Sequence, residues 1–556
     1  MHRQRRLPGQ LAVNFFWLAL LLGSTPAARA QRQEVDVLIR GGTIVDGLGA
    51  PKRVADIAVR GEHIVTIGES LDVKARLEID ARNRIVSPGF VDAHNHSDAG
   101  LQSHSGHLNE QFLSQGVTTV VLGPDGEHSP TRIRALLQSF GERGIGTNVG
   151  FYVGHGGIRS EVLGSRQNRV PSNTELARMT ALVREGMQMG AVGLSSGLMY
   201  SPGLFSERDE LVALVSAVAP FNGIYEVHVR DPHRALLQSN WEVIEVARRA
   251  KVPLDLTHLT TPGKDHRGLM DAVIEQIEDA RRQGVTVVAD QYPYPAVMTI
   301  QLWGVLNYPS EMKNPTREQI RAALRNPEQR RRIREETLSG GTTGFSQLKA
   351  SGASSLLIMA SPDLPQYEGW FVSDVAAARE VDGFEAVAYL LESSTADVVV
   401  SLGGFYEEDM RKLLQRPWVM IASDGAASSN SQTSPFASQH PRSAGTFPRI
   451  LGHYVREQGL LTLEQAIRRM TADPSDFLGF TDRGRIVAGA AADIVIFDPA
   501  TVSDRATWKQ PELRAVGIDT VLVNGVVSFR DGRVTGAARG KFVRRGSAAT
   551  EVVAER

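Results

Sequence analysis

Two histidines separated by one residue close an apolar stretch early in the chain, in the segment Phe90-Val91-Asp92-Ala93-His94-Asn95-His96. In a β-strand, residues two apart project to the same face. His94 and His96 can therefore direct both imidazoles at one metal ion where the strand ends. Two ordinary surface histidines could have the same spacing, so the pair gains meaning only together with ligand-type residues elsewhere in the chain.

Seven further segments have the length and apolar, β-branched composition of buried strands. With the first, the predicted strands are 89–96, 117–123, 148–154, 191–195, 223–229, 252–258, 285–290 and 419–423. Segments with helical spacing separate most of them, such as 174–189, 207–219, 241–250 and 269–282. Eight buried strands alternating with helices predict an α/β fold, a parallel (β/α)8 barrel of the TIM type.

In such a barrel the chemistry takes place at the C-terminal ends of the strands. Here these ends carry histidine and aspartate residues, namely His94, His96, Asp125, His155, His228, His258, Asp290 and Asp424. Histidine and carboxylate ligands suit Zn²⁺, although manganese, iron and cobalt use the same set. A metal with an open position lowers the pKa of bound water to about 7 and polarises a carbonyl oxygen. We therefore predict a hydrolytic centre with one or two divalent ions.

Hydrolysis of an amide also needs a group that takes the proton of water and passes it to the leaving nitrogen. Asp424, at the end of the eighth predicted strand, is the candidate for this general acid/base. The alternative is a turn aspartate before Gly425. His155 is equally well explained as a buried structural histidine, and Asp290 either orients a ligand or caps its strand.

The composition of the chain excludes several classes of partner and of metal site. A chain of 556 residues can bury a large core and more than one domain. With 61 Lys and Arg against 62 Asp and Glu, no net field favours nucleic acid or membranes. The absence of cysteine excludes disulfides, thiol nucleophiles and cysteine ligands, so any metal must be held by histidine and carboxylate.

Residues 1–30 are typical of a secretory signal peptide. Three arginines within the first six residues precede an apolar stretch, 11–22, and the small-residue site Ala28-Arg29-Ala30. The alternative is an uncleaved anchor, although this stretch is short for a membrane span. We expect an exported protein, periplasmic or secreted, that is free of the membrane after cleavage.

Short strands separated by glycine turns flank the barrel, at 35–39, 44–45, 56–60, 63–67, 492–497, 520–523 and 526–529. Neither flank buries much alone, so we predict one small β-domain made of residues 31–87 and 481–540, followed by a tail, 541–556. The predicted barrel spans residues 88–480. Between its last two strands the connection is too long for a loop, and helical patches at 317–324 and 384–392 predict a lid-like inserted subdomain, 300–410.

The chain resembles the amidohydrolase superfamily and, within it, the D-aminoacylase (N-acyl-D-amino-acid deacylase) family, over nearly its whole length after the predicted signal. The His-x-His strand is shared across the superfamily. More specific to this branch are Val153-Gly154-His155-Gly156, Gly193-Leu194-Ser195-Ser196-Gly197-Leu198, Tyr225-Glu226-Val227-His228-Val229-Arg230, Tyr292-Pro293-Tyr294, Ser423-Asp424-Gly425, His440-Pro441-Arg442 and Gly445-Thr446-Phe447-Pro448-Arg449.

This resemblance implies roles for the matching ligand residues. His228 and His258 match the histidines that hold the tightly bound metal. The second, weaker or vacant site of the family matches His94, His96 and Asp424. Asp424 also matches the catalytic acid/base.

The resemblance implies a substrate pocket as well. Arg442 matches the arginine that binds the substrate carboxylate, a task suited to its bidentate guanidinium. Tyr292 and Tyr200 match tyrosines that line the pocket. The family tends to carry a lysine for the same carboxylate where this chain has Thr260, and the nearest lysine, Lys264, is the candidate to replace it.

A second departure concerns the ligands. The family usually has a cysteine ligand in a Gly-Asn-Cys-Gly segment, where this chain reads Gly123-Pro124-Asp125-Gly126. Asp125 can serve as an oxygen ligand there and bridge two metals. Glu127 and His128 are close enough in sequence to compete for that role.

We therefore expect a metal-dependent hydrolase of N-acyl amino acids, preferably D-isomers, whose small-molecule substrate carries a carboxylate. The alternatives are another hydrolase of the superfamily, acting on dipeptides, cyclic amides or lactones, and a non-catalytic relative. Converging ligands argue against the non-catalytic relative, and Arg442 favours an anionic substrate. Nothing in the sequence indicates an oligomeric state.

Overall fold

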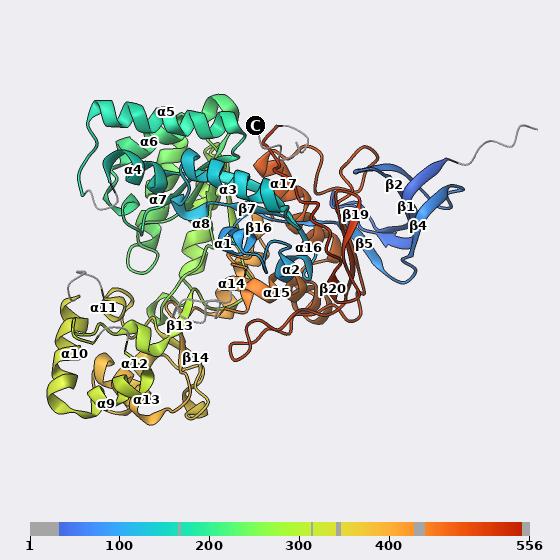
Figure 1. Cartoon of the computed structure of the whole chain (residues 1–556). Helices are drawn as coiled ribbons and strands as arrows, with labels where there is room; N and C mark the ends of the chain where they lie inside the picture. Colours follow the sequence, from blue (N-terminus) through green and yellow to red (C-terminus); the bar gives the residue numbers. More distant parts are fainter. Residues whose placement is uncertain (1–32, 165–167, 313–314, 341–345, 428–439, 547–556) are drawn as a thin grey trace, which may run out of the picture.

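The computed structural model describes residues 33–164, 168–312, 315–340, 346–427 and 440–546, so the predicted signal peptide lies outside the described residues. Figure 1 shows a barrel surrounded by helices, a β-structure built from both chain ends on one side, and a helix-rich insertion below the barrel. Among the described helices, none combines the length and the apolar character needed to cross a membrane.

The barrel contains the eight parallel strands expected from the sequence, and the (β/α)8 prediction is confirmed. In spatial order they are β6 (Phe90–Asp92), β7 (Val117–Leu122), β8 (Asn148–Gly154), β9 (Gly193–Gly197), β10 (Ile224–His228), β11 (Leu254–Leu256), β12 (Val287–Gln291) and β16 (Val419–Ile421). Nearly every residue of these strands is buried, which explains their continuous apolar character.

Amphipathic helices cover the outside of the barrel, among them α3 (Pro130–Arg143), α5 (Asn173–Met189), α6 (Arg208–Ser216), α7 (Leu236–Ala250), α8 (Leu269–Arg282), α14 (Glu407–Leu414) and α16 (Leu463–Met470). Helix α5 illustrates how the sequence sets them. A capping box of Ser172 and Glu175 starts it, and Gly190 ends it in the left-handed conformation. Val183 and Met187, four residues apart, lie on its buried face.

The first and last strands meet through residues just beyond their ends. The backbone N–H of Asp424 donates to the carbonyl of His94 at 3.0 Å, and that of His96 donates to Gly425 at 2.8 Å. Asn95 and Gly425 form a parallel bridge. The barrel is therefore closed at the level where the predicted ligand residues emerge.

A buried carboxylate holds this closure together. Asp92, at the end of β6, accepts hydrogen bonds from the backbone N–H of Ser423 at 2.8 Å and from its hydroxyl. The amide of Asn95 donates to the same carboxylate at 2.8 Å. Asp92 thus ties the chain before His94 to the chain before Asp424.

One nine-stranded sheet joins strands from both ends of the described chain. Its order is β20-β19-β18-β17-β5-β1-β2-β3, with β4 beside β1. The strands are β1 (Glu34–Ile44), β2 (Arg53–Arg60), β3 (His63–Gly68), β4 (Lys74–Asp80), β5 (Ile85–Pro88), β17 (Ile494–Phe497), β18 (Ile518–Val523), β19 (Val526–Arg530) and β20 (Arg533–Val534). The junction is the antiparallel pair of β5 and β17.

The insertion has a hydrophobic core of its own, which includes Ile300, Val375 and Leu390. It consists of β13 (Thr299–Gln301), α9 (Arg317–Arg325), α10 (Pro327–Ser339), α11 (Gln347–Ser351), β14 (Leu357–Ala360), α12 (Val372–Ala378), α13 (Gly383–Ser393) and β15 (Val399–Ser401). The three strands form an antiparallel sheet. Helices α9 and α13 confirm the two helical patches of the sequence.

The closure by Asp92 leads to a prediction about stability. Asp92→Ala leaves three buried donors without their acceptor, and each such group costs about 1–3 kcal/mol. We expect the free energy of unfolding to fall by roughly 3 kcal/mol or more, and by less in Asp92→Asn, which keeps one acceptor oxygen. Urea unfolding followed by circular dichroism measures the change.

The control is Asp209→Ala, which removes a surface carboxylate that pairs with Arg249. Exposed pairs contribute about 0–1 kcal/mol, so this variant should unfold almost like the parent. An effect of Asp92→Ala no larger than that of Asp209→Ala would contradict the role of Asp92.

Candidate metal centre and substrate cavity

A cavity of about 720 Å³ opens at the C-terminal ends of the barrel strands. Most of the predicted ligand residues line it: His96, Asp125, His228, His258 and Asp424. His94 lies fully buried beneath them. Residues 297–299, Gln347 and Leu402, in or beside the insertion, complete the wall. The cavity therefore lies between the barrel and the inserted segment.

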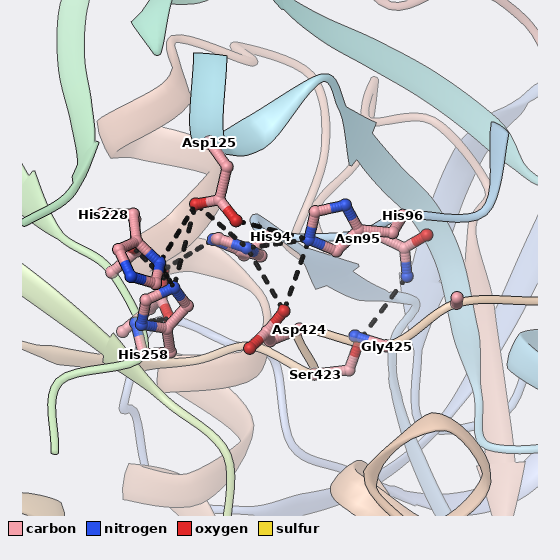
Figure 2. A network of polar contacts seen from close by, with 12 residues as sticks. His94, Asn95, His96, Asp125, His228, His258, Ser423, Asp424 and Gly425 are labelled. Atoms are coloured by element: carbon pink, nitrogen blue, oxygen red, sulfur yellow. Dashed lines mark hydrogen bonds and ion pairs between the residues drawn. The ribbon is translucent and has the colours of Figure 1, made fainter. Parts of the chain in front are cut away.

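Asp125 lies at the middle of the cluster. Its Oδ1 is 3.7 Å from Nδ1 of His228, 3.8 Å from Nε2 of His258 and 4.0 Å from Nε2 of His94. Its other oxygen is 3.8 Å from Nε2 of His96. Figure 2 shows this carboxylate facing all four rings. Asp125 can thus reach both halves of a two-metal centre.

The histidines form two pairs. Nδ1 of His228 and Nε2 of His258 are 2.9 Å apart, and the Nε2 atoms of His94 and His96 are 3.3 Å apart. Asp424 lies 3.4 Å from His94 and 3.3 Å from His96 on the side opposite Asp125 (Figure 2). His228 and His258 thus lie beside Asp125, and His94 and His96 lie beside both Asp125 and Asp424.

These donors fit a divalent ion. Oδ1 of Asp125 is buried without a hydrogen-bond partner, and a buried ionised oxygen is costly unless a cation or donor compensates it. Sets of three ligand atoms, from Asp125, His228 and His258 and from His94, His96 and Asp125, each lie within 4.8 Å of one another. Nitrogen and oxygen donors of this kind suit zinc and other first-row metals.

The backbone at the site is strained. Asp125, His258 and Asp424 all have positive φ, at 56°, 33° and 47°. Non-glycine residues in this region cost about 1–3 kcal/mol each and persist only where the surroundings hold them. Here the carboxylate of Glu226 accepts from the N–H of Asp125 at 3.3 Å, and that of Asp290 accepts from the N–H of His258 at 2.8 Å. The strained backbone thus lies at candidate metal ligands, and hydrogen bonds to neighbouring carboxylates hold two of them, Asp125 and His258, in place.

The carboxylates of Glu226 and Asp290 also face His94. Oε1 of Glu226 is 3.2 Å from Nδ1 of His94, and Oδ2 of Asp290 is 3.8 Å from the same nitrogen. A carboxylate behind a histidine fixes its tautomer and turns the other nitrogen toward the metal. Burial raises the pKa of Glu226 to about 7 and that of Asp290 to about 6. Of the two alternatives for Asp290, ligand orientation fits its hydrogen bond from the backbone N–H of His258.

Sequence reasoning did not single out Glu226 as a functional residue. The signal was present, because Glu226 lies two residues before His228 and so faces the same side of β10. A buried glutamate within a strand is rare unless it is paired.

Arg442 pairs with Asp424 at 2.6 Å, and both side chains are mostly buried. Burial by itself would raise the pKa of Asp424, but Arg442 and His94 outweigh burial and hold this pKa well below its usual range. The guanidinium also lies over the ring of Tyr292, 4.7 Å from its centre. His440, which the sequence showed only as part of a motif, accepts from the N–H of Arg442 at 3.1 Å.

Of the other two predicted substrate contacts, one lines the cavity and the other does not. Tyr200 lines the cavity, and its hydroxyl lies 3.4 Å from Nδ1 of His228. Lys264 does not line the cavity; its ammonium pairs with Asp374 of the insertion instead. The expectation that Lys264 replaces the family's lysine is therefore corrected. Thr260, which stands at the lysine position, does line the cavity.

Glu127, the competitor of Asp125, is 3.5 Å from Nδ1 of His96, on the outer side of that ring. The ligand sets around His228 contain Asp125 and not Glu127. His155 is fully buried and pairs with Glu210 at 2.9 Å away from the cavity wall, as expected of a structural histidine.

Comparison with known proteins also relates the chain to amidohydrolases. The amidohydrolase family model Amidohydro_3 matches residues 323–529. N-acyl-D-glutamate deacylase of Alcaligenes xylosoxydans xylosoxydans is 32% identical over 519 residues, which cover 90% of this chain and 94% of the relative.

Two solved structures of such enzymes are similar to this chain in both sequence and fold. A D-aminoacylase crystal structure is 30% identical and superposes with a TM-score of 0.71 over 92% of this chain and 100% of its own. N-acyl-D-glutamate deacylase from Bordetella bronchiseptica, complexed with zinc and a phosphonate that mimics the tetrahedral intermediate, is 31% identical with a TM-score of 0.70 and the same coverage.

Identity above 30% over nine-tenths of the chain, the shared barrel and the converging ligands lead to one conclusion. The chain belongs to the D-aminoacylase (N-acyl-D-amino-acid deacylase) family of metal-dependent amidohydrolases, hydrolases of carbon–nitrogen bonds other than peptide bonds.

Proposed function

We propose that this protein hydrolyses the amide bond of N-acyl-D-amino acids and releases a free amino acid and a carboxylate. The observation that carries the proposal is Arg442, a buried cation in the cavity wall directly beside Asp424 and the histidine cluster. We further propose that residues 1–30 direct export of the enzyme to the periplasm or the medium.

The metal in this proposal is Zn²⁺, one or two ions. His228, His258 and Asp125 would hold the tight ion, and His94, His96 and Asp424 the weaker one. When bound, the metal lowers the pKa of water and polarises the scissile carbonyl. The zinc complex of the Bordetella relative supports the choice of ion.

Asp424 would act as general base and then as general acid. It lies at the cavity floor between the histidines and Arg442, which keep it ionised and able to accept a proton. The proton that Asp424 takes from water would pass to the amide nitrogen, which otherwise leaves as a strongly basic anion.

Arg442 would bind the carboxylate of the substrate. Its position over the ring of Tyr292 would hold the guanidinium in place for a bidentate contact, while His440 accepts from the backbone N–H of Arg442. A substrate carboxylate that binds Arg442 would compete with Asp424 for the positive charge of the guanidinium. The base would thereby become stronger only when substrate is present.

The side chain of the preferred amino acid would be apolar. The outer wall of the cavity carries apolar side chains, namely Met199, Pro232, Leu236, Val297, Met298 and Leu402. Arg442 is the one lysine or arginine among the described lining residues. A glutamate or aspartate side chain would need a second cation there, because burying an unpaired carboxylate is costly.

The metal assignment predicts the following. His228→Ala and His258→Ala should lose the tight ion, since each removes one of its ligands, and Asp125→Ala should bind it more weakly. Elemental analysis after dialysis against a mild chelator measures the content. Glu127→Ala is the matched control and should keep the tight ion. Full occupancy in both histidine variants would overturn the assignment, and loss in Glu127→Ala alone would move the ligand to Glu127.

The catalytic role of Asp424 predicts that Asp424→Asn folds normally but has a kcat lower by about 10²–10⁴-fold, because an amide cannot accept and return the proton. Steady-state assays with an N-acetyl-D-amino acid measure the loss. Circular dichroism and retention of the tight ion serve as controls. A kcat near that of the parent would exclude Asp424 as the proton carrier.

The substrate is tested by a screen of N-acetyl-D- and N-acetyl-L-amino acids with apolar and acidic side chains, alongside dipeptides, cyclic amides and lactones. We expect the highest kcat/KM for apolar D-substrates. Higher values for L-isomers, dipeptides or cyclic amides would replace the deacylase by a broader hydrolase. Higher values for D-glutamate or D-aspartate substrates would overturn only the side-chain preference.

The carboxylate contact predicts a raised KM in Arg442→Ala. A hydrogen bond to a charged group contributes about 1.5–3 kcal/mol, which corresponds to a rise of roughly ten- to a hundredfold. Arg267→Ala, which removes an exposed arginine paired with Glu408, is the control. An unchanged KM in Arg442→Ala would remove Arg442 as the carboxylate ligand.

A further inference from the structure

A second group of ligand-type side chains lies beside the centre, on the outer side of His96. It consists of Asp98, Glu127 and His128, each of which places one ligand atom within 4.8 Å of the other two. None of the three belongs to the ligand sets around Asp125. Asp98 begins helix α1 (Asp98–Gln102) after the first barrel strand. Glu127 and His128 follow the second strand, after the short η1 turn (Pro124–Gly126).

His128 is the residue that calls for a ligand. Its side chain is only 7% exposed, and its Nε2 has no hydrogen-bond partner. The nearest charged atom is Oδ2 of Asp98, at 3.6 Å. That separation is too long for a hydrogen bond. Two ligands of one tetrahedral zinc ion, each about 2.1 Å from the metal, lie about 3.4 Å apart.

The two carboxylates lack a compensating protein cation. Among the described residues, no lysine or arginine forms an ion pair with Asp98 or Glu127; their partners are His128 at 3.6 Å and His96 at 3.5 Å. A histidine nitrogen with two carboxylate oxygens is a donor set that first-row divalent metals bind. The half-exposed Glu127 side chain leaves an approach from the cavity.

We propose that Asp98, Glu127 and His128 form an additional divalent-cation site, separate from the two-metal centre. Asp98 and Glu127 would each supply one carboxylate oxygen, and His128 its Nε2. Solvent on the cavity side of Glu127 would complete the coordination. The donor set fits Zn²⁺ or Mn²⁺.

Glu127 would connect this site to the centre. One of its oxygens faces Nδ1 of His96, whose Nε2 faces Asp125 and Asp424. A cation on the other oxygen fixes the carboxylate and, through it, the ring of His96. The additional ion thus acts on the ligands of the centre without contacting the substrate.

The test is a count of bound metal. The parent, Asp98→Asn and His128→Gln are loaded by equilibrium dialysis against graded Zn²⁺, and metal per chain is measured by elemental analysis. His104→Gln, a change of an exposed histidine six residues after Asp98, is the matched control. We expect the parent and His104→Gln to bind one equivalent beyond the centre. In Asp98→Asn and His128→Gln the affinity for the additional ion should fall by at least about tenfold. Loss of a residue that only supports a metal ligand already lowers the affinity by about 10- to 100-fold.

Equal stoichiometry and affinity in all four proteins would overturn the proposal, because the additional equivalent would then not depend on Asp98 or His128. Thermal unfolding shows whether the variants are folded. If either variant unfolds, anomalous diffraction at the zinc edge from crystals of the parent decides. A peak between Asp98 and His128 supports the site, and density without a peak there in zinc-loaded crystals overturns it.

Discussion

The closure of the barrel by Asp92 is the interaction on which the site depends. Asp92 joins the end of β6 to Ser423 after β16 and is buried in doing so. The candidate ligands His94 and Asp424 follow Asp92 and Ser423 by two residues and one residue, respectively. Their mutual distance is therefore set by a hydrogen-bonded core and not by the flexible length of the intervening chain. A barrel joined only by side-chain packing would leave these two groups free to separate.

Negative charge dominates the cavity floor. Asp125, Asp424, Glu226 and Asp290 lie around the histidines. Among the described residues, Arg442 is the one arginine or lysine that pairs with any of them. Such a cluster is stable when cations or protons neutralise it. Burial keeps the pKa of Glu226 and Asp290 high, so these two can hold a proton or share the one on His94. Asp125 and Asp424 remain the carboxylates whose negative charge a metal ion would neutralise.

The sequence predicted the barrel well because parallel strands buried on both faces read as continuous apolar runs. Strand β4 was missed although alternate residues of its sequence are exposed and charged, which is the pattern of a half-buried strand. Asp125 was identified from a motif position, yet only the fold shows that it reaches both histidine pairs. Lys264 was misplaced because its partner, Asp374, lies 110 residues away in the insertion. Pairings of that length leave no local trace in a sequence.

Among the described residues that line the cavity, Arg442 is the one lysine or arginine, which bears on how the site can work. With Thr260 in the wall and Lys264 turned to the insertion, the carboxylate of the proposed substrate would depend on Arg442. The same arginine is the ion-pair partner of Asp424. In the proposed mechanism one cation would thus serve both the recognition of the substrate and the ionisation of the base. A ligand without a carboxylate would leave Arg442 paired with Asp424 and the proposed base weak. Recognition and catalysis would then be coupled through a single side chain.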